Sequence, residues 1–355
     1  MPEPFWRPPP DRYPGTLPDK ADVVVIGGGI AGLSLGWHLA QRRIDTVVLE
    51  RNRIGSGASG RNAGLLLAGV ASSYAEAVGT YGRDRAREIW ELTNENHDRM
   101  IEALAGQQVG HRRLGSATLP AGEDEIALLI ESEQLLNEDG FAARWDGVRL
   151  LNPRDGEVNP AALLAALARR LDPRVIREGI NVTALTPRRH GVVVGTPGGE
   201  CEAGVVILAT NAYTPLLSPQ VKIRATRAQM LATEPESKSI ADVPVYSNFG
   251  YRYWRQLPTG EVLIGGWRDT TPDTELTFEA EPTREIQERL DQALVSLGVS
   301  ARVSHRWAGI MGFTESGLPF AGPVEGSANV YVCAGFTGHG MGFAFVTARR
   351  VAQML

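Results

Sequence analysis

Two hydrophobic runs near the start of the chain flank a stretch with the composition of a helix. Residues 21–26 are mostly apolar, residues 30–41 resemble a helix, and residues 45–50 are again mostly apolar and end on Glu50. Apolar runs of this length are typical of strands that are buried on both faces. The sequence therefore predicts a β-α-β unit over residues 21–50.

Helical and strand patterns alternate through the middle of the chain. Amphipathic patterns predict helices at residues 81–104 and 123–136. Asn159 and Pro160 offer an N-cap and a first-turn proline to a helix that ends at residue 171. Short apolar runs around a turn at residues 197–199 predict strands at residues 175–177, 180–185, 191–196 and 205–210.

Longer strands and two further helices are predicted after residue 210. A hairpin turn at residues 257–260 joins two predicted strands. Apolar residues at four-residue spacing predict a helix at residues 282–297. The predicted strands are residues 222–233, 245–256, 261–267 and 329–335, and a terminal helix covers residues 341–355.

These elements predict an α/β fold, α+β overall, in which a Rossmann-like domain holds an inserted antiparallel sheet. We expect the Rossmann-like domain to be discontinuous, because strands with its character occur in three separate stretches. Residues 1–20 form a proline-rich lead-in, residues 21–75, 150–220 and 300–355 form the nucleotide-binding domain, and residues 76–149 and 221–299 form the inserted substrate domain.

Charge and composition narrow the possible partners. The 355 residues carry 36 Lys and Arg against 41 Asp and Glu, a net charge of -5, which argues against nucleic acid as a partner. The longest apolar stretch, residues 23–40, contains five glycines and His38, so no membrane span is expected. The first 20 residues lack the pattern of a secretory signal, and the two cysteines form no paired motif. We therefore expect a cytoplasmic protein without a metal site.

Glycine is abundant, with 40 residues, and the densest group is at residues 27–32. This segment matches GxGxxG directly after a predicted strand and directly before a predicted helix. Gly27 would permit the tight turn, Gly29 would let the backbone approach a pyrophosphate, and Gly32 would let the helix pack against the strand. Glu50, at the end of the next strand, could accept hydrogen bonds from a ribose. The pattern predicts a dinucleotide site that includes Ile30 and Ala31 at the positive helix start.

The segment that follows distinguishes FAD from NAD. Residues 51–64 read RNRIGSGASGRNAG, a loop of small residues and amides that can present backbone donors to a second phosphate. DVVVIGGGIAGLS, VVLER and GASGRNAG together resemble the FAD-binding start of the D-amino-acid-oxidase-like (DAO) flavoenzyme superfamily. GASGRNAG after a Trp- and Pro-rich leader is most similar to the amine-oxidising branch that contains γ-glutamylputrescine, sarcosine and glycine oxidases. Similar landmarks follow in family order at residues 205–214, 307–322 and 335–341.

The resemblance implies that FAD is bound at both ends of the chain. The cysteine that tethers flavin in sarcosine oxidases is missing from residues 309–314, and the tethering histidine of dimethylglycine-dehydrogenase-like relatives is missing from residues 60–62. FAD is therefore expected to bind non-covalently. Beyond the glycine turn and Glu50, the implied cofactor contacts are Arg51, Ala58, Ser59, Arg61, Asn62, Ala63, Gly64, Val182, Thr210, Asn211, Gly312, Gly338, His339, Gly340 and Met341.

The last loop could also influence the charge on the flavin. The N-terminus of the helix after Gly340, together with His339, would stabilise negative charge on the reduced ring. Alternatively, His339 is a loop residue that is satisfied by backbone hydrogen bonds.

The expected substrate follows from departures from the family pattern. Met311 stands where related amino-acid oxidases carry an arginine that clamps the substrate carboxylate, and Met341 replaces another arginine. An amine or N-alkylated substrate is therefore favoured over a simple α-amino acid, unless another arginine substitutes. Strand alternation places Tyr251, Tyr253 and Arg255 on one face and Arg252 and Trp254 on the other. Either face could contact substrate, or both could only pack the sheet.

The sequence thus predicts an FAD-dependent enzyme that removes hydride from the carbon next to an amine nitrogen, leaving an imine that water hydrolyses. Oxygen is the expected electron acceptor, and the oligomeric state stays open. One alternative is a glycine or D-amino-acid oxidase that uses Arg252 or Arg255 as carboxylate anchor. Another is a flavoprotein subunit that passes electrons to a partner. The candidate catalytic residues are Tyr253, Arg255, Met311 and His339.

Overall fold

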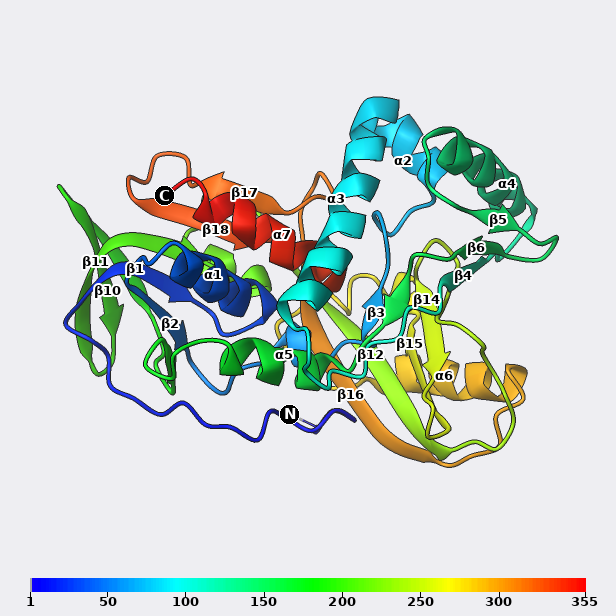
Figure 1. Cartoon of the computed structure of the whole chain (residues 1–355). Helices are drawn as coiled ribbons and strands as arrows, with labels where there is room; N and C mark the ends of the chain where they lie inside the picture. Colours follow the sequence, from blue (N-terminus) through cyan, green and yellow to red (C-terminus); the bar gives the residue numbers. More distant parts are fainter. Residues whose placement is uncertain (1) are drawn as a thin grey trace.

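Two eight-stranded sheets and the helices that cover them form the molecule, in a computed structural model that describes residues 2–355. Figure 1 shows the first sheet with helices α1 and α7 at one end and the second sheet with helix α6 at the other. The C-terminus lies beside the first sheet, whereas Phe5 and Trp6 near the N-terminus pack against residues of the second sheet. The mixed α/β class predicted from sequence is confirmed.

The first sheet has a parallel centre, in the order β18-β11-β1-β2-β8. Its central strands are buried over residues 23–26, 46–49, 206–208 and 332–334, because helices cover one face and an antiparallel extension covers the other. The strands are β1 (Lys20–Ile26), β2 (Thr46–Glu50), β8 (Ile176–Glu178), β11 (Gly199–Leu208), β18 (Val330–Ala334), the edge strand β17 (Phe320–Pro323), and the extension β9 (Ala184–Arg188) and β10 (Gly191–Thr196).

Three helices cover one face of this sheet: α1 (Ile30–Gln41), α5 (Pro160–Arg169) and α7 (Gly340–Ala352). A long helix, α3 (Arg83–Ala103), crosses over α7 (Figure 1). Buried Asn96 of α3 donates to the Met341 carbonyl and accepts from the backbone N–H groups of Phe345 and Val346. This amide thereby fixes the start of α7 against α3.

The second sheet is antiparallel except where β13 pairs with β4, and its order is β16-β12-β15-β14-β13-β4-β6-β5. Helix α6 (Arg284–Ser296) buries Ile286, Leu290 and Leu294 against it. The strands are β4 (Ser116–Leu119), β5 (Arg144–Trp145), β6 (Leu150–Asn152), β12 (Arg224–Pro235), β13 (Val245–Ser247), β14 (Arg252–Gln256), β15 (Glu261–Gly266) and β16 (Val303–Phe313).

The remaining elements connect the two sheets. They are the helices α2 (Tyr74–Tyr81) and α4 (Glu123–Glu138), the strand pair β3 (Leu65–Leu66) and β7 (Gly156–Glu157), and the 3-10 turns η1 (Ala58–Gly60), η2 (Asn211–Leu216) and η3 (Arg268–Thr270).

Several predicted elements are confirmed. The β-α-β unit forms, the strand at residues 191–196 is β10, and Asn159 caps α5 by accepting from the Ala162 N–H at 3.0 Å. Strand β16 lies in the segment assigned to the nucleotide-binding domain but pairs with β12 of the second sheet.

Three boundary predictions were wrong. Residues 180–183 form a loop instead of a strand, and the strand starts only at Ala184. The predicted strand at residues 245–256 is divided into β13 and β14, because Asn248 and Phe249 both adopt a φ of 53° and turn the chain. The helix predicted from residue 81 starts at Arg83, because Gly82 adopts a φ of 81° and ends a preceding helix, α2, that the sequence pattern did not reveal.

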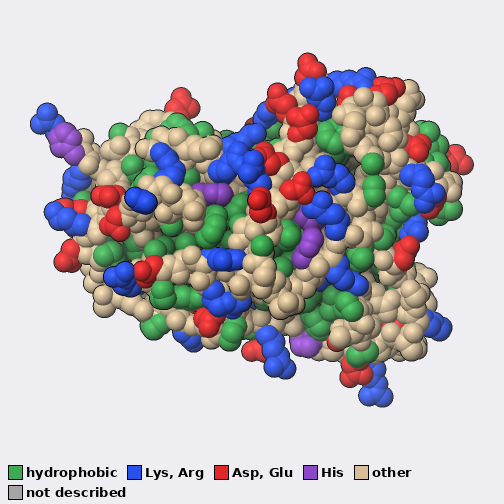
Figure 2. All heavy atoms as spheres, in the orientation of Figure 1, with side chains coloured by type: hydrophobic (Ala, Val, Ile, Leu, Met, Phe, Trp, Pro, Cys, Tyr) green, Lys and Arg blue, Asp and Glu red, His purple; other side chains and the backbone are tan. Residues whose placement is uncertain are grey.

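Acidic and basic side chains are interspersed on the face shown in Figure 2, so neither sign of charge dominates that face. Within residues 2–355, no helix is both long and apolar enough to cross a bilayer.

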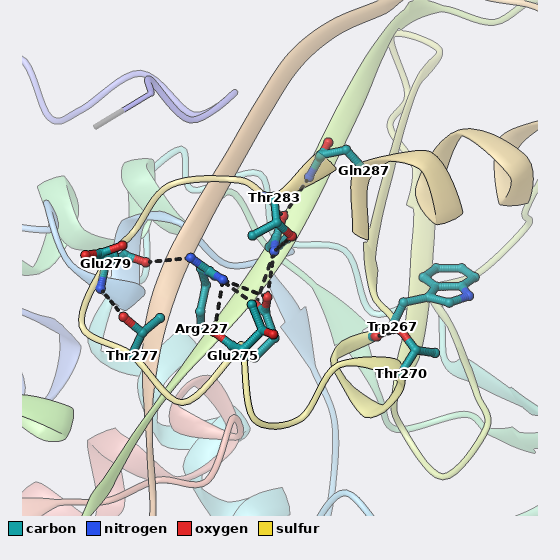
Figure 3. Close-up of polar contacts among 10 residues, drawn as sticks. Arg227, Trp267, Thr270, Glu275, Thr277, Glu279, Thr283 and Gln287 are labelled. Carbon is teal, nitrogen blue, oxygen red and sulfur yellow. Dashed lines mark hydrogen bonds and ion pairs between the residues drawn. The ribbon is translucent and has the colours of Figure 1, made fainter. Parts of the chain in front are cut away.

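A buried ion pair fixes the loop between β15 and α6 onto the second sheet. Arg227 of β12 donates to both carboxylate oxygens of Glu275 at 2.9 Å, and its side chain is 5% exposed against 1% for Glu275. Figure 3 shows Arg227 beside Glu275. Gln229 joins this pair by donating to Glu275 and to the Thr283 hydroxyl. Because both side chains are buried, removal of one partner would leave the other buried and uncompensated.

We predict that Glu275→Ala lowers the free energy of unfolding by about 3 kcal/mol, because Arg227 is then left buried without its carboxylate. The matched control is Glu288→Ala, which removes an exposed pair with Arg284 and should cost less than about 0.5 kcal/mol. Urea unfolding followed by circular dichroism measures both. Equal losses in the two variants would contradict the assignment of Glu275 as an anchor.

Candidate cofactor and substrate site

A cavity of about 520 Å³ lies where the first sheet meets the second. The carboxyl ends of β1, β2 and β11 open into it, as is usual for ligand sites in parallel sheets. Segments far apart in the chain contribute to its walls. They lie within residues 26–31, 49–64, 180–183, 209–217, 309–311 and 336–342, and they are joined by residues of β12, β13 and β14 and by Arg268.

The glycine turn brings the end of β1 into close contact with its neighbours. Gly27 has a φ of 113°, and a Cβ there would lie 2.7 Å from the Ala209 carbonyl oxygen. A Cβ on Gly32 would lie 1.8 Å from the Gly27 carbonyl oxygen. Gly32 therefore does not line the cavity; it allows α1 to pack against the turn, the role that the sequence pattern predicts for it.

The start of α1 presents backbone donors to the cavity. Gly29, Ile30 and Ala31 line it, and the N–H of Ile30 donates to the Ser59 hydroxyl at 3.0 Å. A Cβ on Gly29 would lie 2.9 Å from that hydroxyl oxygen. The positive helix end, bordered by the small residues Gly29, Ala31 and Ser59, fits a pyrophosphate.

Glu50 is held at the rim by two backbone groups. Its carboxylate accepts from the N–H groups of Gly28 and Asn52, each at 2.8 Å. Burial raises the pKa of Glu50. Gly28, which sequence reasoning treated as a variable position, must also be small, because a Cβ there would lie 2.9 Å from the Glu50 Cβ. The fixed carboxylate is suited to accept ribose hydroxyl groups.

The loop at residues 51–64 is braced from within. The Asn62 amide donates to the carbonyls of Ala58 and Ser59, and its oxygen accepts from the Gly64 N–H. Asn62 and its neighbours Ala63 and Gly64 all line the cavity, as does the η1 turn. The amide therefore shapes this wall without using side-chain bulk.

Two of the arginines predicted to contact the cofactor line the cavity in different ways. The Arg61 guanidinium donates to the carbonyls of Ser56 and Ala308, so it joins the loop to β16, and burial lowers its pKa. Arg51 stacks over the Tyr213 ring at 4.3 Å. The hydrogen bonds of Arg61 therefore hold its guanidinium in the wall, whereas Arg51 lies beside the Tyr213 ring near Glu50.

Two indoles that the sequence pattern did not single out support this wall from behind, without lining the cavity themselves. Trp6 in the lead-in donates to the Asn62 carbonyl and Trp307 of β16 donates to the Arg61 carbonyl, each at 2.8 Å. Both side chains are buried. The proline-rich lead-in therefore packs against the loop at residues 51–64, which we call the cofactor loop. In the sequence, only the Trp and Phe residues of the lead-in could have predicted this packing.

The opposite wall joins β11, β16 and the last loop. Asn211, with a φ of 46°, accepts from the Gly335 N–H at 2.9 Å, and Thr210 precedes it along the cavity. Gly312 does not line the cavity: a Cβ there would lie 2.9 Å from the Asn211 Oδ1. Its carbonyl accepts from the Thr337 N–H, so Gly312 lets the last loop approach β16. The loop at residues 180–183, including Val182, lines the site near Glu50.

His339 caps α7 at the N-terminal end and faces the cavity. Its Nδ1 lies 3.4 Å from the Thr337 carbonyl, and burial lowers its pKa to about 4. Its Nε2 is buried and has no partner among the described residues. Gly338, Gly340 and Met341 line the cavity around it. The backbone contact thus satisfies one ring nitrogen only, and the other is placed to meet a bound ligand.

Aromatic and thioether side chains of the second sheet form the remaining wall. Tyr246 and Tyr253 line it with ring centroids 5.9 Å apart, and burial raises the pKa of both. Met230 and Met311 lie on the same cavity. This wall is largely apolar and keeps its phenols neutral.

Strand alternation placed Arg255 on the same face as Tyr253, but the structure does not bring it to the cavity. Its side chain is 2% exposed, lies 3.5 Å from the Glu157 carboxylate, and donates to the Gly64 carbonyl. Burial lowers its pKa to about 10. Arg255 therefore braces the cofactor loop from behind and is not available to a substrate carboxylate.

Comparisons with known proteins agree with this geometry. The family model described as "DAO: FAD dependent oxidoreductase" matches residues 22–354. The chain is 28% identical to gamma-glutamylputrescine oxidoreductase of Escherichia coli over 94% of this chain and 83% of that protein. It is 25% identical to glycine oxidase of Geobacillus kaustophilus over 95% of this chain and 93% of that one. The crystal structure of glycine oxidase from the same species shares the fold, with a TM-score of 0.79, 22% identity, and coverage of 95% and 94%.

The residues fit FAD. The positive start of α1 suits the pyrophosphate, Glu50 suits the ribose, and the His339 Nε2, which has no partner among the described residues, lies on the wall at the other end of the cavity. Neither Cys201 nor Cys333 lines the cavity, and burial raises the pKa of Cys333 to about 12.

We predict that Gly32→Ala abolishes FAD retention, because the new Cβ would overlap the Gly27 carbonyl oxygen and push α1 away from the turn. The matched control is Gly79→Ala in α2, which lies outside the cavity lining and where a Cβ meets nothing within 4 Å. The flavin absorbance per mole of purified protein measures both. Normal flavin content in the Gly32 variant would refute the packing argument, and loss in the Gly79 variant would show that the test lacks specificity.

Proposed function

The chain belongs to the DAO family of FAD dependent oxidoreductases, and from that premise we propose that it oxidises the carbon–nitrogen bond of an amine or an N-substituted amino acid. The observation that carries the proposal is the wall of Tyr246, Tyr253, Met230 and Met311, which borders the FAD cavity at the His339 end. Such a wall suits the apolar part of an amine and excludes water from the reacting carbon.

Bound FAD supplies the redox chemistry by accepting a hydride from the carbon next to the substrate nitrogen. The protein holds FAD through the start of α1, Glu50 and the braced loop at residues 51–64. The Tyr246 and Tyr253 wall orients the substrate. The imine that results leaves for solvent, where water hydrolyses it.

The substrate nitrogen must be neutral before it releases a hydride. The ionisable groups around the wall favour the neutral amine. Burial keeps the phenols of Tyr246 and Tyr253 protonated, so they offer no negative charge to an ammonium ion, and the Arg268 guanidinium repels such an ion. The residues that form this wall therefore need no dedicated base: the cavity lowers the amine pKa and the proton passes to solvent.

Oxygen is the electron acceptor in this proposal, and hydrogen peroxide is the second product. An anaerobic screen tests the proposal: the FAD-loaded protein is mixed with amines, N-methyl amino acids and D-amino acids, and the flavin absorbance is followed. Bleaching by secondary amines, with peroxide in a 1:1 ratio on admission of air, supports it.

The same screen separates the alternatives. Bleaching by unsubstituted amino acids alone would replace the proposal with an oxidase of the glycine oxidase kind. Reduced flavin that persists in air would assign the electrons to a protein partner. A flavin that none of these compounds bleaches would overturn the proposal.

His339 is expected to act as a neutral donor or acceptor in this reaction, since its pKa lies at about 4. His339→Gln should therefore slow flavin reduction by up to about 10-fold. The rate should still rise with pH between about pH 6 and 9, and the midpoint of that rise should stay unchanged. Stopped-flow reduction across this range is the measurement, and His190→Gln at an exposed site is the control. A shift of that inflection in the His339 variant alone would make His339 the titrating base.

A further inference from the structure

We propose that Arg268 binds a carboxylate of the substrate and thereby selects an N-substituted amino acid over a simple amine. This inference rests on the proposed function and names the substrate class of the same cavity. It reverses the expectation drawn from Met311, because the positive charge that is missing from β16 enters the cavity from a different element.

Arg268 opens the η3 turn directly after β15 and lines the cavity. Its guanidinium stacks over the Tyr251 ring at 4.4 Å and lies 5.3 Å from the centre of the Phe313 ring. It is close enough to Tyr253 and His339 to lower the pKa of each by its charge. The cation therefore shares the wall at which the substrate is proposed to bind.

Within residues 2–355, no carboxylate forms an ion pair with Arg268, and no side-chain hydrogen bond holds its guanidinium. Other arginines of the second sheet differ in this respect. Arg252 lies 3.3 Å from Asp269, Arg255 lies 3.5 Å from Glu157, and Arg227 lies 2.9 Å from Glu275. The hydrogen-bonding capacity of Arg268 is therefore left for a ligand.

The residues on either side of Arg268 are fixed. Trp267 adopts a φ of 62°, its carbonyl accepts from the Thr270 hydroxyl at 2.8 Å, and Arg252 stacks over its ring at 5.1 Å. Asp269 accepts from the Asn248 amide at 3.2 Å. Figure 3 shows Trp267 and Thr270 in the same loop that the Arg227 and Glu275 pair anchors farther along. The Arg268 backbone is thus held in place before any ligand binds.

The chemistry of the ligand follows from this unpaired charge. A guanidinium presents parallel N–H donors that match the two oxygens of a carboxylate. A simple amine would enter as an ammonium ion, which the cation repels, and would leave the guanidinium unpaired beside aromatic rings. A secondary amino acid would pair its carboxylate with Arg268 and direct its N-alkyl group toward the Tyr253 and Met311 wall.

The first test needs no turnover. The FAD-loaded protein is titrated with butanoate, and the perturbation of the flavin absorbance reports binding. Saturable binding that weakens by about 10- to 100-fold in Arg268→Met, the usual loss for hydrogen bonds to a charged group, supports the proposal. Arg268→Lys should give an intermediate affinity, and Arg284→Met, at a site where the side chain is 92% exposed, should match the unmodified protein.

The second test compares turnover within two pairs of secondary amines, each with one compound that carries a carboxylate and one that lacks it. The first pair is 4-(methylamino)butanoate and N-methylbutylamine, and the second pair is N-methylglycine and dimethylamine. The unmodified protein should prefer the carboxylate partner of at least one pair, and Arg268→Met should remove that preference mainly by raising KM, at unchanged FAD content. The role of Arg268 would be overturned if butanoate bound equally to the unmodified protein and to both Arg268 variants. It would also be overturned if the unmodified protein oxidised both compounds of each pair equally well. If no amine reduces the flavin while butanoate still binds through Arg268, the carboxylate site holds and the proposed function fails.

Discussion

The structure depends on how closely four backbone segments approach one another at the end of β1. Gly27 lies against Ala209 of the strand beside it, Gly32 against Gly27, and Gly28 against Glu50, and a Cβ at any of these glycines would lie within 3 Å of a neighbouring atom. This crowding brings the positively polarised N-terminus of α1 to the edge of the parallel sheet. A dinucleotide can bind there only because these positions lack side chains.

The two sheets contribute different parts of one site. The first sheet supplies the helix start, Glu50, Asn211 and the loop of His339, all of which line the cavity. The second sheet supplies the wall of Tyr246 and Tyr253. Arg61 joins them, because its guanidinium bonds a carbonyl of the cofactor loop and a carbonyl of β16. The catalytic chamber is therefore created by the contact between the sheets and exists in neither alone.

Local patterns were enough to predict the cofactor half of the site from the sequence. Gly27, Gly29, Gly32 and Glu50 lie in one β-α-β unit, where spacing along the chain determines position in space. The substrate half could be derived only in part. Tyr253 was among the predicted candidates and lines the cavity, whereas Tyr246 and Arg268 come from a strand and a turn whose pairing the pattern does not specify. Arg255 shows the limit of strand alternation: the predicted face was right, but Glu157 and the Gly64 carbonyl hold the guanidinium behind the wall. Arg268 was missed because it follows the end of a strand, in a turn set by the left-handed backbone of Trp267.

A crystal structure of the protein with FAD bound tests the central claim most directly, namely that one cofactor spans the cavity from the glycine turn to the His339 loop. The account predicts the pyrophosphate at the backbone of Gly29 to Ala31, the ribose at Glu50, and the flavin ring between His339 and the wall of Tyr246 and Tyr253. A flavin ring outside this chamber, or a pyrophosphate away from the start of α1, would contradict it.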